Sequence, residues 1–244
     1  MSEGCERAAR VRPLQARCRL PEVMDDPALD AARHRHALRG LARLNWWSGS
    51  VRILWEPLCS LALEMGRPVV ILDVATGAGD VPIGLWHRAQ RLGLPLRIEG
   101  CDASPMAIEY ASQRSAQAGA GVRFFGLDTR TSPFPDGYDV LLCSLFLHHL
   151  DGADATALLR KMAQAARRMV LVNDLVRSVS GFALAYAGTR LLTTSEVVQA
   201  DGPRSVRAAF TVEEAQALAA RAGLDGAVVH RRWPCRFLLR WTRS

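Results

Sequence analysis

Two glycines placed two residues apart follow a run of aliphatic residues and a carboxylate. The run ends at Asp73, and Gly77 and Gly79 then lead into a helical pattern. Glycine lets the backbone turn sharply and leaves room for a ligand. The N–H groups that open the next helix face that ligand. This spacing predicts a backbone cradle for a small-molecule cofactor, in which Asp73 binds the ligand, caps neighbouring N–H groups, or does both.

Two common nucleotide-binding motifs are excluded. A dinucleotide fingerprint needs a third glycine for close packing of helix on strand, and this chain has Pro82 there. A phosphate loop of the Walker type needs a Gly-Lys-Ser/Thr sequence. The only lysine is Lys161, far from the glycines.

Acidic residues also follow the next two predicted strands. Asp102 ends the strand that starts near residue 96, and Asp128 follows the one that starts near 122. A carboxylate at a strand end can accept hydrogen bonds from both hydroxyls of a ribose. The alternatives are a helix cap before Pro105 for Asp102 and an ordinary turn acid for Asp128.

The segment 72–80, Leu-Asp-Val-Ala-Thr-Gly-Ala-Gly-Asp, resembles the first motif of class I S-adenosylmethionine (SAM)-dependent methyltransferases. It is especially similar to the form in quinone-biosynthesis methyltransferases, and the resemblance extends over roughly 67–174. It implies SAM as cofactor and S-adenosylhomocysteine as product. It also implies that Asp102 binds the ribose, Asp128 the adenine amino group, and Asp73 the methionine amino end. The cofactor-binding residues that it implies are Asp73, Ala75, Thr76, Gly77, Gly79, Asp102, Ala103, Met106, Asp128, Thr129 and Ser144.

Two adjacent histidines are the candidate catalytic residues. His148 and His149 follow the predicted fourth strand, at the sheet edge where such folds bind ligands. Either one could take a proton from a phenol or a carbon acid at neutral pH. Alternatively, one packs beside the cofactor and the other caps a helix. Asn173 and Asp174, after the fifth strand, either bind the acceptor or satisfy the loop backbone.

The residues around the predicted cleft are apolar and aromatic, which favours an aromatic or polyketide-like acceptor. The alternative for these aromatic side chains is ordinary packing of the lid. The predicted wall contains Trp46, Trp47, Trp55, Phe146, Phe182 and Tyr186. The predicted substrate-binding residues are Trp47, Phe146, Asn173, Asp174, Phe182 and Tyr186. We expect methylation of oxygen. The alternatives are carbon methylation of a quinone precursor and a non-catalytic SAM-binding subunit.

Strand and helix patterns alternate along the chain, which predicts an α/β fold. We expect a Rossmann-like, doubly wound, seven-stranded, mostly parallel sheet with an antiparallel last strand and an N-terminal helical lid. Residues 1–30 are predicted to form a disordered tail, 31–66 the lid, and 67–244 the SAM-binding methyltransferase domain. That domain carries a helical insertion at about 177–205. A Thr-x-x-Glu capping box at Thr211 opens the last helix.

Composition is ordinary for a soluble globular protein, with 49% hydrophobic and 23% charged residues among 244. The net charge of +7 comes mostly from dispersed arginines, so we expect no nucleic-acid partner. The six cysteines form no Cys-x-x-Cys pair, and we expect no metal site. We expect no transmembrane segment, a cytoplasmic location, a small-molecule acceptor, and a monomer or homodimer.

Overall fold

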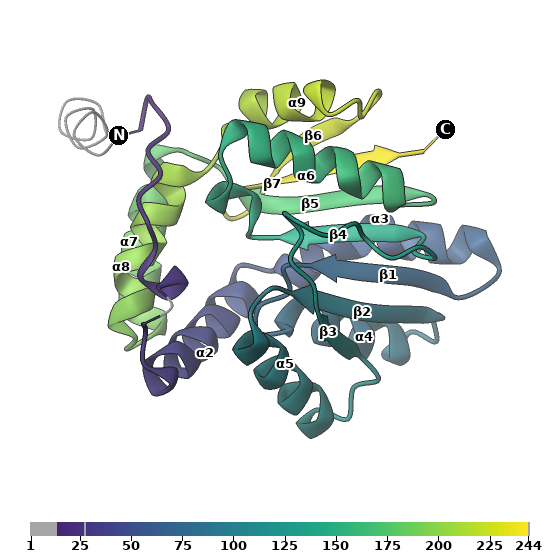
Figure 1. Cartoon of the computed structure of the whole chain (residues 1–244), viewed down its shortest axis with the longest axis horizontal. Coiled ribbons are helices and arrows are strands. Elements are labelled where there is room, and N and C mark those ends of the chain that lie inside the picture. Colours follow the sequence, from purple (N-terminus) through teal and green to yellow (C-terminus); the bar gives the residue numbers. More distant parts are fainter. Residues whose placement is uncertain (1–13, 27, 244) are drawn as a thin grey trace.

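A computed structural model of the chain describes residues 14–26 and 28–243. One seven-stranded sheet runs through it in the order β3-β2-β1-β4-β5-β7-β6 (Figure 1). Neighbouring strands β1 to β5 pair in parallel, whereas β7 is antiparallel to both β5 and β6. The predicted fold class is confirmed. The strands are β1 (Val69–Val74), β2 (Leu96–Asp102), β3 (Arg123–Gly126), β4 (Val140–Ser144), β5 (Met169–Leu175), β6 (Val228–Arg232) and β7 (Arg236–Thr242).

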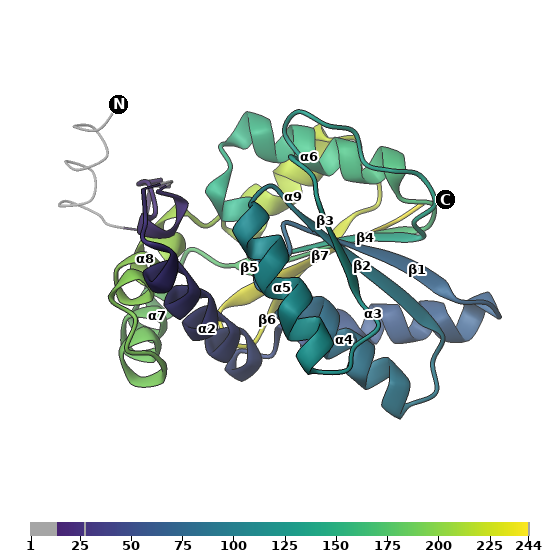
Figure 2. The ribbon, with the colours of Figure 1, turned by 60° about the horizontal axis from the view of Figure 1, so that its bottom comes forward.

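Helices cover both faces of the sheet, because the central strands carry aliphatic side chains on both sides. Helices α3 and α4 lie against one face and α6 and α9 against the other (Figure 2). The described helices are η1 (Val23–Asp25), α2 (Ala31–Trp47), α3 (Ser50–Met65), α4 (Asp80–Arg91), α5 (Pro105–Gln117), η2 (Leu147–His149), α6 (Gly152–Ala165), α7 (Val179–Leu192), α8 (Glu196–Ala208) and α9 (Val212–Arg221). Helix α9 opens with the expected capping box between Thr211 and Glu214.

Only part of the predicted lid, 31–66, lies over the ligand-binding edge. Helix α2 packs against α7 and α8, which form the insertion after β5 (Figure 1). Helix α3 instead packs on the sheet, where Leu54 and Leu58 are fully buried. Its strongly apolar face therefore belongs to the core. The insertion extends to residue 208, slightly beyond the expected end.

The described part of the predicted tail is attached to the rest of the protein. Arg17 Nη2 donates to the carbonyl oxygens of His148 (2.9 Å) and Leu150 (2.6 Å). The backbone N–H groups of Val23 and Met24 donate to the Asp201 carboxylate on α8. These polar contacts hold Arg17, Val23 and Met24 against the rest of the protein. The disorder expected for residues 1–30 stays a prediction. Residues 1–13 lie outside the described residues. We call residues 14–26 the N-terminal strap.

Candidate active site

A cavity of about 1140 Å³ lies at the carboxyl edge of the parallel strands. Loops after β1, β2, β3 and β4 form one side, and α2, α7, α8 and the N-terminal strap form the other. Ligand pockets for one small molecule are commonly 300–1,000 Å³, on the order of this volume or smaller. The cavity therefore has room for two small molecules together.

The glycine loop after β1 forms the floor at one end of the cavity. Ala75, Thr76 and Gly77 line it, and the Gly77 N–H donates to Asp102 Oδ2 at 2.9 Å. Gly79 lies behind this surface with a φ of 69°, and a Cβ built there would lie 2.8 Å from the Phe124 ring. Gly79 therefore allows the loop to pack closely against Phe124 and Ala111. Of the two glycines, Gly77 is the one that lines the cavity and can contact a ligand there.

Asp73 lies behind the same loop and is 2% exposed. The Thr76 hydroxyl donates to its Oδ2 at 2.6 Å, while Oδ1 has no hydrogen-bond partner among the described residues. Burial raises the pKa of Asp73 to about 8, against the smaller lowering effect of the Thr76 hydrogen bond. A buried oxygen without a partner is costly. It would be stabilised by a cation or a water that reaches the loop from the cavity.

The second and third predicted acids face the cavity directly. Asp102 lines it with Ala103 and Met106, and its Oδ1 accepts the Ser104 N–H at 2.9 Å. Each carboxylate oxygen has more than one lone pair, so Asp102 can still accept hydroxyl groups. Asp128 lines the cavity beside Thr129. The backbone N–H of Arg130 donates to Asp128, which lowers the pKa of that carboxyl.

His148 is 4% exposed and lines the cavity. Its Nδ1 lies 2.6 Å from Asp174 Oδ1, and its backbone N–H donates to Asp174 Oδ2 at 3.1 Å. Burial opposes the charged form of Asp174, but the His148 interactions and the Leu175 N–H outweigh it, so the pKa of Asp174 is lowered. Because a carboxylate only accepts, Nδ1 carries the proton and Nε2 is left to face other groups.

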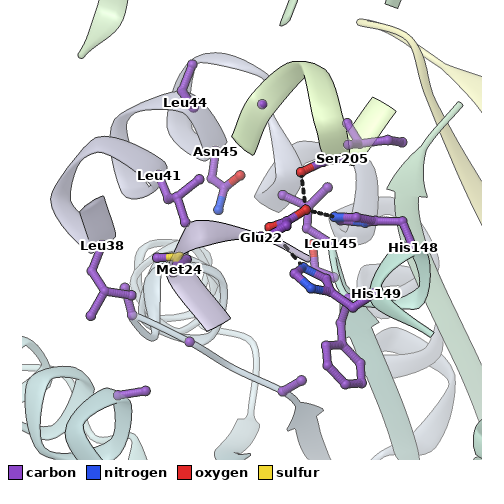
Figure 3. Close-up of a pocket in the computed structure, with 18 of the residues that line it drawn as sticks. Glu22, Met24, Leu38, Leu41, Leu44, Asn45, Leu145, His148, His149 and Ser205 are labelled. Atoms are coloured by element: carbon purple, nitrogen blue, oxygen red, sulfur yellow. Dashed lines mark hydrogen bonds and ion pairs between the residues drawn. The ribbon is translucent and has the colours of Figure 1, made fainter. Parts of the chain in front are cut away.

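His149 lines the cavity beside His148, with 4.5 Å between the ring centroids. Its ring stacks on Phe146 at a centroid distance of 5.8 Å. The Glu22 carboxylate of the N-terminal strap lies between the two imidazoles and Ser205 (Figure 3). The strap thus brings an acidic group to the histidines.

The part of the cavity wall formed by α2 and α7 is mainly aliphatic. Leu38, Leu41 and Leu44 project from α2, one helical turn apart (Figure 3). Helix α7 presents Gly181, Leu184, Ala185 and Gly188 to the cavity, which is one face of a helix. Small residues on that face widen the cavity. The spacing of these residues in the sequence is that of one helix face, and the prediction of an aromatic wall did not use it.

Four of the aromatic residues expected in the wall do not line the cavity. Phe182 and Tyr186 lie on another face of α7, and Tyr186 is 50% exposed. Trp46 is 84% exposed, and Trp55 is buried in the α3 core. The aromatic-wall prediction is therefore corrected at these positions. Trp47 and Phe146 do line the cavity.

Asn173 and Asp174 are buried behind the cavity wall and do not line it. Asn173 Nδ2 donates to the hydroxyl of Ser144 at 2.8 Å, and Ser144 does line the cavity. The prediction that these two residues contact the acceptor is therefore not supported. They act on the cavity through the residues that they orient.

Several charged residues that line the cavity were not among the site residues predicted from the sequence, and Glu22 and Arg236 are two of them. Glu22 lies in the segment that had no recognisable pattern. Arg236 begins β7, is 4% exposed, and donates to the hydroxyls of Ser48 and Ser50. Burial lowers the pKa of Arg236 to about 10, although Asp174 and Asp80 act in the opposite direction. The position of Arg236 beside the apolar residues of a predicted strand was the sequence feature that could have indicated a buried charge.

Residues 71–168 match the family described as "Methyltransferase domain". Together with the sheet order and the glycine loop, this match supports the predicted resemblance to class I SAM-dependent methyltransferases. The chain is 31% identical over 128 residues to a demethylmenaquinone methyltransferase of Thermus thermophilus. That alignment covers 52% of this chain and 56% of the relative. The chain spans about half the length of the curated relatives it matches, 56% and 48%.

Solved methyltransferase structures share the fold. An O-methyltransferase family 2 protein of Planctomyces limnophilus in complex with apigenin has a TM-score of 0.62 and 18% identity, over 90% of this chain and 63% of that one. Magnesium protoporphyrin IX methyltransferase of Synechocystis with bound S-adenosylhomocysteine has a TM-score of 0.55 and 16% identity, over 100% and 95%. Among the described residues, no helix is long and apolar enough to cross a membrane.

Proposed function

We propose that this protein transfers a methyl group from SAM to an oxygen atom of a small, largely apolar acceptor. The observation that carries the proposal is His148, which lines the same cavity as the glycine loop and is held from behind by Asp174. SAM supplies an electrophilic methyl group on a sulfonium. The protein has to bind it, hold the acceptor oxygen in line, and take the proton of a phenol or other hydroxyl.

The groups at the glycine loop fit the two ends of SAM. Asp102 offers carboxylate lone pairs at the point where the loop turns, which suits ribose hydroxyls. Asp73 Oδ1 has no hydrogen-bond partner among the described residues, and a positively charged amino group near the loop would stabilise it. Asp128 follows β3 by two residues and lines the cavity, and we assign it to the adenine amino group.

His148 is the better candidate for the base because Asp174 holds its tautomer. With Nδ1 protonated toward Asp174, the lone pair of Nε2 is available to an acceptor proton. Asp174 also stabilises the imidazolium that forms. We assign His148 as the catalytic residue and Asp174 as a positioning residue. The leucines of α2 and the small residues of α7 exclude water and admit an apolar skeleton.

The experiment is product analysis with methyl-labelled SAM and a panel of simple phenols in metal-free, chelator-treated buffer. Label recovered as a methyl ether supports oxygen methylation. No transfer to any hydroxyl acceptor, by a protein that binds SAM and S-adenosylhomocysteine, would contradict it.

The second candidate is carbon methylation of a quinone precursor, because the curated relatives are demethylmenaquinone methyltransferases. The quinone-type motif of residues 72–80 also favours it. The same product analysis with a naphthoquinol distinguishes the two, since carbon methylation gives a product that resists ether cleavage.

A further inference from the structure

Three groups that can bind a metal converge in the wall of the cavity. Glu22 Oε1 lies 3.9 Å from His148 Nε2, and Glu22 Oε2 lies 3.7 Å from His149 Nε2 (Figure 3). All three ligand atoms lie within 4.8 Å of one another. The side chains are 10%, 4% and 22% exposed for Glu22, His148 and His149. The expectation of no metal site did not foresee this cluster, because the fold brings together residues far apart in the chain.

Hydrogen bonds to neighbouring residues orient His148 and Glu22. Asp174 accepts from His148 Nδ1 at 2.6 Å, so His148 Nε2 is directed toward Glu22. The Ser205 hydroxyl donates to Glu22 Oε1 at 2.5 Å. Carboxylates that orient a metal-binding imidazole, and donors that orient a metal-binding carboxylate, are the usual second layer of protein metal sites.

The arrangement of the donor atoms suits a cation. The two imidazole rings are 4.5 Å apart, with the Glu22 carboxylate beside both of them. Neutral rings each offer a nitrogen lone pair, and Glu22 adds a carboxylate oxygen. Three electron-pair donors then surround one small volume.

We propose that Glu22, His148 and His149 form a binding site for a divalent transition-metal ion of the zinc class. Two imidazole nitrogens and one carboxylate are a donor set that zinc accepts, with a further coordination position left open. Ligand atoms around tetrahedral zinc lie roughly 3.4 Å apart. The contacts of 3.9 and 3.7 Å thus need only small side-chain adjustments. All three residues line the cavity, so the open position faces it.

Metal binding has a consequence for proton transfer. The ion takes the Nε2 lone pair of His148, which is the atom that we assign as the base. Occupancy of the site and base catalysis by His148 therefore exclude each other, and zinc inhibits methyl transfer. This consequence rests on the proposed function, whereas binding of the ion does not.

The direct test is titration of chelator-treated protein with Zn²⁺ against a chromophoric chelator. Co²⁺ absorption then serves as a probe of the ligands. We expect one ion per chain, and binding at least about tenfold weaker in Glu22→Gln and in His149→Ala, since each loses one ligand. Thermal unfolding followed by circular dichroism establishes that each variant is folded. The matched controls are Glu56→Gln and His230→Ala, which alter an exposed carboxylate and an exposed imidazole elsewhere and should bind as wild type.

Three results overturn the site: no stoichiometric binding by wild type, unchanged binding in the folded Glu22→Gln or His149→Ala variant, or loss of binding after alkylation of the cysteines. The last would place the ion on thiolates. If zinc binds as expected but methyl transfer continues unchanged, the metal site stands and the assignment of His148 as base fails.

Discussion

His148 Nδ1 and Asp174 Oδ1 are 2.6 Å apart, and both residues lie at the carboxyl edge of the sheet, after β4 and within β5. This contact fixes the ring orientation and directs Nε2 to the cavity. It gives a physical basis for preferring His148 to its neighbour His149, which the sequence alone left open.

Replacement of His148 by alanine tests the base. We expect kcat to fall by roughly 100-fold or more, since general bases contribute about 10²–10⁴-fold. Affinity for S-adenosylhomocysteine should stay near the wild-type value. The difference in kcat between wild type and His148→Ala should become smaller as the acceptor phenol becomes more acidic, because a more acidic phenol loses its proton without a general base. His149→Ala, assayed in the same metal-free buffer, should show a smaller fall in kcat. Equal kcat values for wild type and His148→Ala would contradict the assignment of His148 as the general base.

Asp174→Asn tests the positioning of that base. An amide cannot stabilise the imidazolium as a carboxylate does, so we expect kcat to fall by roughly tenfold or more with little change in the acceptor KM. Nitrogen NMR of labelled protein should show the tautomer of His148 changing. A folded variant that keeps both the wild-type kcat and the wild-type tautomer would make the contact purely structural.

Gly79→Ala tests the close packing behind the loop. The added Cβ would lie 2.8 Å from the Phe124 ring and 3.0 Å from Ala111, at a φ of 69°. Gly119→Ala is the matched control, because Gly119 also has positive φ but no atom within 4 Å of the added Cβ. Both variants carry the left-handed strain of roughly 1–2 kcal/mol. Gly79→Ala should therefore lower Tm further and also weaken SAM binding; identical behaviour would contradict the packing role.

Asp73 makes a pH-dependent prediction. Its folded pKa of about 8 lies above the unfolded value of about 3.9. The folded state therefore holds the proton more tightly, and stability falls as pH rises from about 4 to about 8. Asp73→Asn should match the wild-type Tm near pH 4 and exceed it increasingly toward pH 8.5, while binding SAM less tightly. Parallel Tm curves across that pH range would show that Asp73 is not protonated in the folded protein.

Sequence patterns predicted the elements of the sheet because their signals are local. Strand-like runs ending at Asp73 and Asp102, and the capping box at Thr211, depend only on neighbouring residues. Glu22 could not be found this way, since its contacts to Ser205 and the histidines exist only after folding. Helical spacing also could not tell whether an apolar face such as that of α3 covers a cleft or the sheet.

The affinity of the metal-free protein for S-adenosylhomocysteine, measured by isothermal titration calorimetry for wild type and Asp102→Ala, tests the assignment of the glycine loop to SAM binding most directly. Wild type should bind one equivalent. The variant should bind roughly 10–100-fold more weakly, because hydrogen bonds to a charged group contribute about 1.5–3 kcal/mol. Folded wild-type protein that gives no binding heat with either S-adenosylhomocysteine or SAM, or an Asp102→Ala variant with unchanged affinity, would contradict the assignment of this cavity to SAM.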